Sequence, residues 1–106
     1  MKSSPSEFER RCHALLRQIP KGRVTTYKAI AEALGTKAYR AVGRAMGTNP
    51  DPVIVPCHRV VASNGSLGGY SPGIEKKIAL LESEGVRIER GRVVDFKRVA
   101  WSDFSV

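Results

Sequence analysis

The chain has 106 residues, with 18 Lys or Arg against 10 Asp or Glu and a formal net charge of +8. This length provides one domain with one modest hydrophobic core and excludes a second domain of ordinary size. The hydrophobic fraction of 42% is that of a globular protein, and no apolar stretch is long enough to cross a membrane. The positive charge favours a polyanionic partner, because cations that neutralise phosphates release condensed counterions.

The beginning of the chain and its two cysteines bear on the compartment. Residues 1–9 contain Ser and acidic residues where a secretory signal would have a basic start and an apolar stretch. We therefore expect an intracellular protein, in the cytoplasm or with the nucleoid or nucleus. The two cysteines lie far apart and are expected to be thiols. The pairs Cys12-His13 and Cys57-His58 lack the spacing of a zinc site, so we expect no metal and no cofactor.

A first amphipathic helix is predicted over residues 6–18, and Pro20 and Gly22 end the pattern. Its apolar residues recur at helical spacing: Phe8, Cys12, Leu15, Leu16 and Ile19. On this face we expect Cys12 to be a buried small hydrophobe and His13 to be a solvated surface residue.

Two short helices follow, separated by one glycine-containing turn. Thr25 or Thr26 is placed to cap the first, whose apolar face carries Ile30, Ala31 and Leu34, and Gly35 ends it. The second is expected over residues 37–46, with Thr36 as its cap and Gly47 as a left-handed C-terminal turn. Its expected apolar side is Ala38, Ala41, Val42, Ala45 and Met46. Together they form the outline of a helix-turn-helix.

The second of these helices carries a stripe of cations at i, i+3 and i+7, formed by Lys37, Arg40 and Arg44. Most such stripes are solvated helix flanks, and the stripe alone favours that interpretation. Small residues such as Gly43 and Gly47 change the balance, because glycine inside a helix costs about 1 kcal/mol relative to Ala. A thin helix surface indicates close approach to a partner, so the stripe is a candidate contact to a phosphate backbone.

After an irregular loop at residues 49–52, the apolar run 53–55 is predicted to be a short buried strand that ends in residues 56–60. A glycine-rich loop, 63–73, leads to a helix over 74–84 that is ended by Gly85. Its inward side is expected to include Ile78, Leu81 and, as a further candidate, Ala79.

The pattern of residues 86–94 predicts a hairpin around Arg90-Gly91. We expect the aromatics of the tail to pack it onto the body: Phe96, Trp101 and Phe104.

Cys57 is the candidate nucleophile, since it stands between an apolar run and a flexible loop and is followed by His58 and Arg59. A thiol attacks as its thiolate, and nearby cations or a basic imidazole lower its pKa. Buried structural cysteines are nevertheless commoner, and this local pattern alone leaves both interpretations open. Neighbouring strand residues point apart, so His58 would need a bridging water or a turn to reach the sulfur.

The run Pro56-Cys57-His58-Arg59-Val60 resembles the active-site signature of the O6-alkylguanine-DNA alkyltransferases. Three other blocks agree in order and spacing, and Glu84 closes the helix behind them: Arg40-Ala41-Val42-Gly43, Asn49-Pro50 and Gly68-Gly69-Tyr70-Ser71. The resemblance extends from about residue 20 to residue 85. It implies a mainly α fold with a small β element, the winged helix-turn-helix-like C-terminal domain of that family. We expect one domain over 1–106, with the helix-turn-helix at about 26–47, the site strand and loop at about 53–73, and the hairpin and tail at 86–106.

The resemblance implies a partner, double-stranded DNA containing O6-alkylguanine, with the helix-turn-helix in the minor groove. Arg40 would fill the gap left by the flipped nucleotide, and Tyr27 would crowd the phosphate that rotates. The expected DNA-binding residues are Tyr27, Lys37, Arg40, Ala41, Gly43 and Arg44.

The family also implies roles for the residues around Cys57. Cys57 would accept the alkyl group, activated by His58 through a water, with Glu84 orienting the histidine. Asn49 would brace the loop, Tyr70 would donate a proton to guanine N3, and Ser71 would bond the O6 side. The backbone carbonyls of Cys57 and Val60 would contact the guanine edge, and Arg59 would tie the site to a carboxylate. The product, a thioether on Cys57, is stable to water, so each molecule would act once. The implied activity is that of a methylated-DNA-protein-cysteine S-methyltransferase. O4-alkylthymine remains open as a second substrate.

The chain departs from the family pattern in three respects. Many members have an N-terminal α/β domain ahead of this region, whereas only a short helix precedes it here. Three explanations remain open: the chain is a fragment, it is a natural compact form, or a separate domain acts as its partner. We expect a monomer. Some relatives of this size are alkyltransferase-like proteins with Trp or Ala in place of the reactive Cys, and Trp101 resembles their tail whereas Cys57 does not. Arg44 and Gly47 stand where a small and a basic residue, respectively, are frequent.

Two other functions remain alternatives. A non-catalytic damage sensor would bind O6-alkylguanine and recruit excision-repair proteins, and Cys57 would stay unreactive. A transcription regulator with a fortuitous cysteine would prefer one DNA sequence and would be indifferent to alkylation.

Overall fold

A computed structural model describes residues 6–49, 51, 53–70 and 72–105 of the chain. The helices and strands in chain order are α1 (Glu7–Leu16), β1 (Thr25–Thr26), α2 (Tyr27–Ala33), α3 (Tyr39–Gly47), the 3₁₀-helix η1 (Cys57–Arg59), β2 (Val60–Val61), α4 (Ile74–Ser83), β3 (Ile88–Glu89), β4 (Arg92–Val93) and α5 (Phe96–Val99). The mainly α fold with small β elements that the sequence predicts is confirmed.

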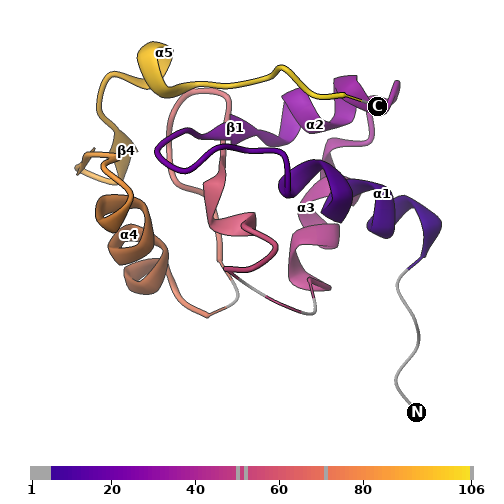
Figure 1. Cartoon of the computed structure of the whole chain (residues 1–106), viewed down its shortest axis with the longest axis horizontal. Coiled ribbons are helices and arrows are strands. Elements are labelled where there is room, and N and C mark those ends of the chain that lie inside the picture. Colours follow the sequence, from indigo (N-terminus) through magenta and orange to yellow (C-terminus); the bar gives the residue numbers. More distant parts are fainter. Residues whose placement is uncertain (1–5, 50, 52, 71, 106) are drawn as a thin grey trace.

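A pair of short parallel strands lies at the centre of the molecule. In β1 and β2, Thr25 pairs with Val60 and Thr26 with Val61. Helices α1, α2 and α3 lie on one side of this pair, while α4 and the hairpin β3–β4 lie on the other (Figure 1). After α5 the tail runs back across the molecule toward α2 (Figure 1). The segment that begins with η1 is therefore placed between the helix-turn-helix and α4.

The hydrophobic residues form two clusters, one on each side of the strand pair. One packs α1, α2 and α3 around Val55, Cys57 and Val60, and Trp101 and Phe104 from the tail lie against it. The other packs β2, α4 and the hairpin, with Val24 and Val61 among its buried residues. Alternation along the strands explains the division, since neighbouring strand residues point to opposite faces. The expected packing of the three tail aromatics is confirmed, because Phe96 lies against the second cluster.

Helix α1 begins where local capping predicts. The Ser6 hydroxyl accepts the Glu9 N–H and the Glu9 carboxylate accepts the Ser6 N–H, at 3.1 and 2.9 Å, which is a capping box. Cys12 is fully buried as expected. The expectation that His13 is a solvated surface residue is wrong. His13 is 7% exposed, and its Nε2 donates to the Ala45 carbonyl of α3 at 2.8 Å, which ties the two helices together.

The helix-turn-helix is formed by α2 and α3, with small shifts from the predicted boundaries. Thr26 caps α2, accepting the Ala29 N–H at 2.9 Å. Thr36 does not cap α3; its hydroxyl accepts the Ala38 N–H two residues on, and the helix begins at Tyr39. Lys37 therefore precedes the helix instead of occupying its first turn. Gly47 is likewise not a left-handed turn, because it is the last residue of α3 and is followed by the C-cap Thr48 with φ −100°.

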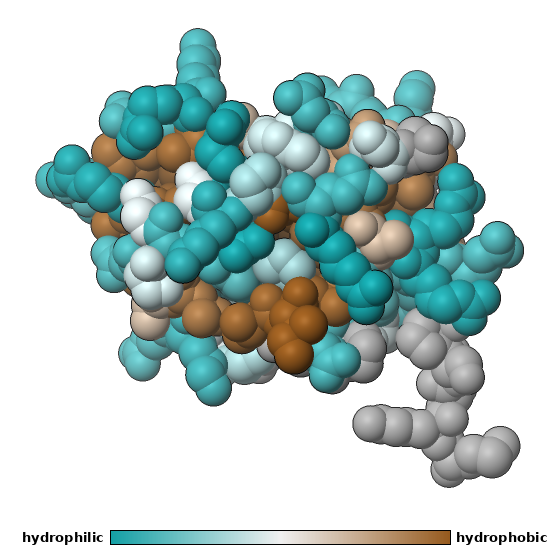
Figure 2. All heavy atoms as spheres, in the orientation of Figure 1, coloured by the Kyte–Doolittle hydropathy of each residue, from teal (hydrophilic) through white to brown (hydrophobic). Residues whose placement is uncertain are grey.

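The expected buried strand at 53–55 is wrong. Val53 and Ile54 are exposed, at 48% and 77%, and only Val55 is buried. The Val55 N–H bonds to the Asp51 carbonyl at 2.8 Å, which closes a turn, and Val53 has φ +83°. A local turn thus uses the backbone groups that a strand would pair. Hydrophobic atoms gather at the lower edge of an otherwise largely hydrophilic face in Figure 2.

The C-terminal part largely follows the predictions. Helix α4 covers 74–83, Leu81 is buried and Ile78 partly buried, but Ala79 is exposed, so its inward placement is wrong. Strands β3 and β4 pair antiparallel around Arg90 and Gly91, with φ +53° and +73°, which confirms the hairpin. Within the described residues no helix has the length and apolar character needed to span a bilayer.

Candidate active site

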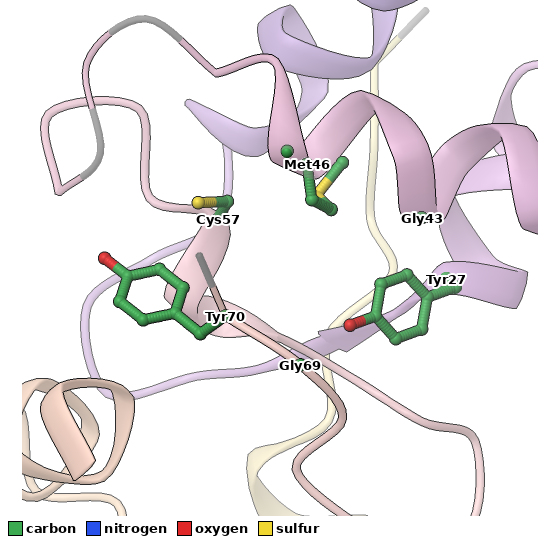
Figure 3. Close-up of a pocket in the computed structure, with 7 residues that line it drawn as sticks. Tyr27, Gly43, Met46, Cys57, Gly69 and Tyr70 are labelled. Atoms are coloured by element: carbon green, nitrogen blue, oxygen red, sulfur yellow. The ribbon is translucent and has the colours of Figure 1, made fainter. Parts of the chain in front are cut away.

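A pocket of about 360 Å³ lies where α3 meets the segment that carries Cys57. Its lining residues are Tyr27, Gly43, Met46, Gly47, Cys57, Gly69 and Tyr70. In Figure 3, Cys57 and Met46 lie on one side of the pocket and the two tyrosines on the other, with the Tyr27 hydroxyl directed toward its middle. The pocket thus joins the candidate nucleophile directly to the second helix of the helix-turn-helix.

Cys57 is the first residue of η1, and this turn changes the relation between the thiol and its neighbour. The side chain is largely buried, with 5% of the residue exposed. Burial raises the pKa of the Cys57 thiol, while a hydrogen bond with the Asn49 side chain and the charge of Lys77 act in the opposite direction. Because residues 57–59 form a 3₁₀ turn instead of a strand, His58 need not point away from the sulfur. Of the two routes expected from the sequence for His58 to reach the sulfur, a bridging water or a turn, the structure contains the turn.

His58, Glu84 and Arg59 form a largely buried polar cluster beside Cys57. Nε2 of the fully buried His58 lies 3.0 Å from Oε2 of Glu84, which assigns the proton to Nε2 and leaves Nδ1 as an acceptor. Arg59 donates to both Glu84 oxygens, at 2.9 and 2.7 Å, and to the Ile19 carbonyl at 2.7 Å. The structural position expected for Arg59 is confirmed.

The electrostatics of the cluster favour a neutral histidine beside a charged carboxylate. Burial lowers the pKa of His58, against the opposing effect of Glu84. Burial raises the pKa of Glu84, but the hydrogen bonds and charges of Arg59 and His58 outweigh it and hold the pKa below its ordinary value. Among the described residues no protein atom bonds Nδ1 of His58. A neutral imidazole with a free buried acceptor is suited to take a proton through a water.

Asn49 braces the loop that leads into Cys57. Its Nδ2 donates to the Val55 carbonyl at 2.6 Å, and its Oδ1 accepts the Asp51 N–H at 3.0 Å. These two bonds hold both ends of the turn at 51–55. The Asn49 side chain also acts to lower the pKa of the Cys57 thiol.

Two tyrosines flank Cys57, and burial raises the pKa of both phenols. The Tyr70 hydroxyl is buried and has no partner among the described residues, so it is free to donate to a ligand in the pocket. Tyr27, the first residue of α2, packs over Gly68, where an added Cβ would lie 2.8 Å from the Tyr27 hydroxyl. Gly68 has φ +70°, so both the close approach and the backbone conformation favour glycine.

The candidate DNA-contact residues lie at the exposed start of α3. A shallow depression there is lined by Lys37, Ala38, Tyr39, Arg40, Ala41 and Arg44. All three cations are exposed. Gly43, also exposed, borders the Cys57 pocket, and nothing lies within 4 Å of a Cβ built on it. The helix is thin on this side, as the sequence analysis expects.

Of the remaining candidates, Ser71 lies outside the described residues, and Val60 is fully buried in β2. Sequence reasoning missed Lys77, whose fully buried ammonium donates to the carbonyls of Val60, Leu67 and Gly69. It also missed Met46 as part of the pocket wall. The available signal for Lys77 was its position one turn before Leu81, on the inward side of α4. Within the described residues no group of three or more His, Cys, Asp or Glu is placed to hold a metal.

Comparison with known proteins agrees with this geometry. A 71-residue segment is 59% identical to a methylated-DNA–protein-cysteine methyltransferase of Saccharolobus solfataricus, covering 67% of this chain and 46% of that protein. The crystal structure of Mycobacterium tuberculosis OGT in complex with DNA superposes with a TM-score of 0.74 and 46% identity, over 76% of this chain and 51% of the other. S. pombe Atl1, in complex with damaged DNA containing O6-carboxymethylguanine, gives a TM-score of 0.80 at 32% identity, over 93% and 98% of the two chains.

The fold and the site define a helix-turn-helix domain with a buried cysteine at the base of a pocket beside the second helix. Residues 7–86 match the family model described as "6-O-methylguanine DNA methyltransferase, DNA binding domain". The chain belongs to this family. It spans about half or less of the length of the first curated relatives that it matches.

Proposed function

We propose that this protein transfers the alkyl group of O6-alkylguanine in double-stranded DNA to Cys57, irreversibly and once per molecule. One observation carries the proposal: Cys57 shares a pocket with Gly43, Met46 and Gly47 of α3, the helix beside which the exposed cations lie. A protein that only reads DNA sequence does not require a thiol in a pocket beside this helix. A nucleophile that acts on a flipped base does require one there.

DNA would bind across the start of α3. Lys37, Arg40 and Arg44 would contact phosphates, and the thin surface at Ala41 and Gly43 would let the helix enter the minor groove. Arg40 would occupy the space of the extruded nucleotide. Tyr27, held over Gly68 at the pocket wall, would press on the phosphate that rotates.

Transfer would begin with loss of the thiol proton. The proton passes from Cys57 through a water to Nδ1 of His58, and Glu84 stabilises the resulting imidazolium through its bond to Nε2. The thiolate attacks the alkyl carbon, a carbon–sulfur bond forms, and the bond from that carbon to O6 breaks. The electron pair of the broken bond stays with the purine.

The pocket would assist departure of the purine by protonating it. The buried Tyr70 hydroxyl, which has no partner among the described protein atoms, would donate to guanine N3. Ser71 would bond the O6 side, and the carbonyls of Cys57 and Val60 would accept from the exocyclic amine. A stable thioether remains on Cys57, so no step restores the thiol.

The test compares three proteins on one duplex that carries a labelled O6-methylguanine. The wild type should move the label to protein; Cys57→Ala should bind the duplex and transfer nothing; Arg40→Ala should transfer slowly because flipping is impaired. Retained transfer by Cys57→Ala would refute the assignment. Tight lesion binding without transfer by the wild type would indicate a damage sensor, and equal binding of alkylated and plain duplexes would indicate a regulator.

The proposal places the protein inside the cell as a monomer that needs no cofactor. Gel filtration of the free protein and of its DNA complex tests the oligomeric state. A second domain supplied by another chain, or excision-repair proteins, would be detected as added mass on the complex.

A further inference from the structure

Lys77 is a buried cation that the proposed transfer does not use. Its residue exposure is 0%, and its ammonium donates to three backbone carbonyls, of Leu67 at 2.6 Å, Val60 at 2.7 Å and Gly69 at 3.2 Å. An ammonium has three donors, and all of them are used. No carboxylate of the described residues forms an ion pair with it. A buried charge without a carboxylate is costly and requires an explanation.

The three carbonyls belong to β2 and to the glycine-rich loop, and Gly69 of that loop lines the Cys57 pocket. Val60 follows the η1 turn in β2, and Gly69 precedes Tyr70 in the glycine-rich loop. One ammonium therefore holds the segment that carries the thiol against the segment that carries the phenol. Glu84 follows Lys77 by seven positions and is the C-cap of α4, so this helix positions both the carbonyl clamp and the partner of His58.

Lys77 interacts electrostatically with Cys57, while its N–H groups donate to the three carbonyls. It favours the thiolate, and the thiolate in turn favours the protonated amine, although burial lowers the pKa of Lys77 to about 8. The other titratable group of the described residues with which Lys77 interacts electrostatically is His58 of η1. Glu84 is already engaged by both Arg59 and His58. Within the described part of the chain, the thiolate of Cys57 is the anion left for Lys77.

We propose that Lys77 is a positioning residue that also supplies the counter-charge for the Cys57 thiolate. This inference rests on the proposed function only in that the thiolate is the species that takes the alkyl group. The clamp sets the distance between Cys57 and Tyr70, and the positive charge stabilises the anion that the burial of Cys57 disfavours.

A distinct pH dependence follows. An ordinary thiol becomes more reactive as the pH rises, because more of it ionises. Here the counter-charge is fully present below the pKa of Lys77 and is lost as the pH rises through about 8. The wild-type transfer rate should therefore level off or fall above that pH.

The experiment measures alkylation of Cys57 by iodoacetamide across pH, without DNA, and single-turnover transfer from an O6-methylguanine duplex. Lys77→Met removes charge and clamp; Lys77→Gln keeps an amide donor for the carbonyls but removes the charge. Lys76→Met is the matched control, because Lys76 is the exposed neighbour on α4. Peptide mapping separates Cys57 from Cys12, and urea unfolding reports the stability of each variant.

We expect both Lys77 variants to lose about tenfold in iodoacetamide rate at neutral pH, since tenfold corresponds to one pKa unit. Their profiles should move to higher pH without the alkaline decline, while Lys76→Met follows the wild type. Lesion binding, measured by anisotropy in a Cys57→Ala background, should change less than twofold. If the pH profile of the iodoacetamide rate of Lys77→Gln overlays that of the wild type, the counter-charge role of Lys77 is refuted. It is also refuted if the loss of rate only follows the loss of stability in urea.

The two proposals fail separately. A wild type that transfers normally, with unshifted Lys77 profiles, refutes this inference and leaves the proposed function intact. A wild type that never transfers, but whose iodoacetamide profile responds to Lys77, refutes the proposed function alone. If Lys77→Met does not fold, Lys77→Gln carries the test.

Discussion

Single residues around Cys57 act against the effect of its burial. A buried thiol resists ionisation, and the described neighbours that favour the anion are Asn49 and Lys77, while His58 is placed to accept the proton. The sequence motif contains Cys57 and His58 side by side. Their cooperation depends on the η1 turn and on Glu84, which come from a different part of the chain.

Glu84 is expected to stabilise the fold as well as the site. Its side chain is 8% exposed and is bonded by Arg59 and His58. Replacing it by Ala leaves the largely buried guanidinium of Arg59 without its carboxylate partner and should cost about 3 kcal/mol in urea unfolding. Ser83→Ala, an exposed neighbour, is the control. A loss below 1 kcal/mol would show that the cluster is not a structural element.

The same carboxylate should shape acid stability. Folding lowers the pKa of Glu84, so its contribution is fully present above the unfolded pKa and is lost as the pH falls through the folded value. Glu84→Gln should therefore flatten the decrease of unfolding free energy at acid pH, measured by urea titrations at several pH values. Parallel wild-type and variant curves would exclude this role.

Gly68 is expected to position Tyr27. An Ala there forces φ +70° on a residue with a Cβ and places that carbon 2.8 Å from the Tyr27 hydroxyl. Gly91→Ala is the matched control, with φ +73° and nothing within 4 Å. Both should lose about 1–2 kcal/mol of stability, but only Gly68→Ala should also slow transfer in a single-turnover assay. Equal transfer rates for the two variants would contradict the role assigned to this contact.

At the level of elements, the proposed function assigns the contact with DNA to α3 and the support of the chemistry to α4. Helix α3 presents cations and small residues, and its C-terminal end forms the pocket wall. His13 of α1 holds that end through the Ala45 carbonyl. Helix α4 supplies Lys77 from its first half and leads into Glu84.

Gly43 tests whether the thin surface of α3 serves an incoming partner. Because nothing lies within 4 Å of an added Cβ, Gly43→Ala should stabilise the helix by about 1 kcal/mol. The same methyl group would stand at the DNA face, so binding to a lesion duplex should weaken. Urea unfolding and fluorescence anisotropy measure the two effects. A variant with improved stability and unchanged binding would show that the surface does not contact DNA.

Much of the element order was predictable from sequence, because helical periodicity, capping residues and glycine turns are local signals. Residues 53–55 show where such signals fail: three consecutive apolar residues favour a strand, but the bonds of Asn49 and Asp51 close a turn instead. His13 was misjudged because its partner is a carbonyl on another helix.

The part of the candidate site that could be predicted from the sequence is the set of residues that belong to recognisable motifs. The local pattern already indicated Cys57 with His58, and the resemblance added Asn49, Tyr70 and Glu84. Neither indicated Lys77. A lysine inside an amphipathic helix is ordinarily solvated, and only the folded arrangement of the loop brings three carbonyls to its ammonium.

At the scale of the whole molecule, the proposed function requires both the net positive charge and the Cys57 pocket for recognition of damaged DNA. Under the proposed function, the net charge of +8 would attract DNA of any sequence, while the pocket beside α3 would select for a base that has left the stack. Affinity should therefore depend on salt, and selectivity on the lesion.

The salt dependence of binding can be assigned to particular cations. Arg44→Ala should lower the slope of log affinity against log salt by about 1, whether the duplex is plain or alkylated. Arg90→Ala, at the turn of the β3–β4 hairpin, is the control and should leave the slope unchanged. Equal effects of both variants would mean that the cations near α3 form no defined contact.

The central claim, that Cys57 accepts an alkyl group, is tested most directly by the intact mass of the protein after incubation with a duplex that contains one O6-methylguanine. The account predicts a single added methyl group per molecule, located at Cys57 by peptide mapping and absent with a plain duplex. An unchanged mass for a protein that binds the lesion tightly would contradict it.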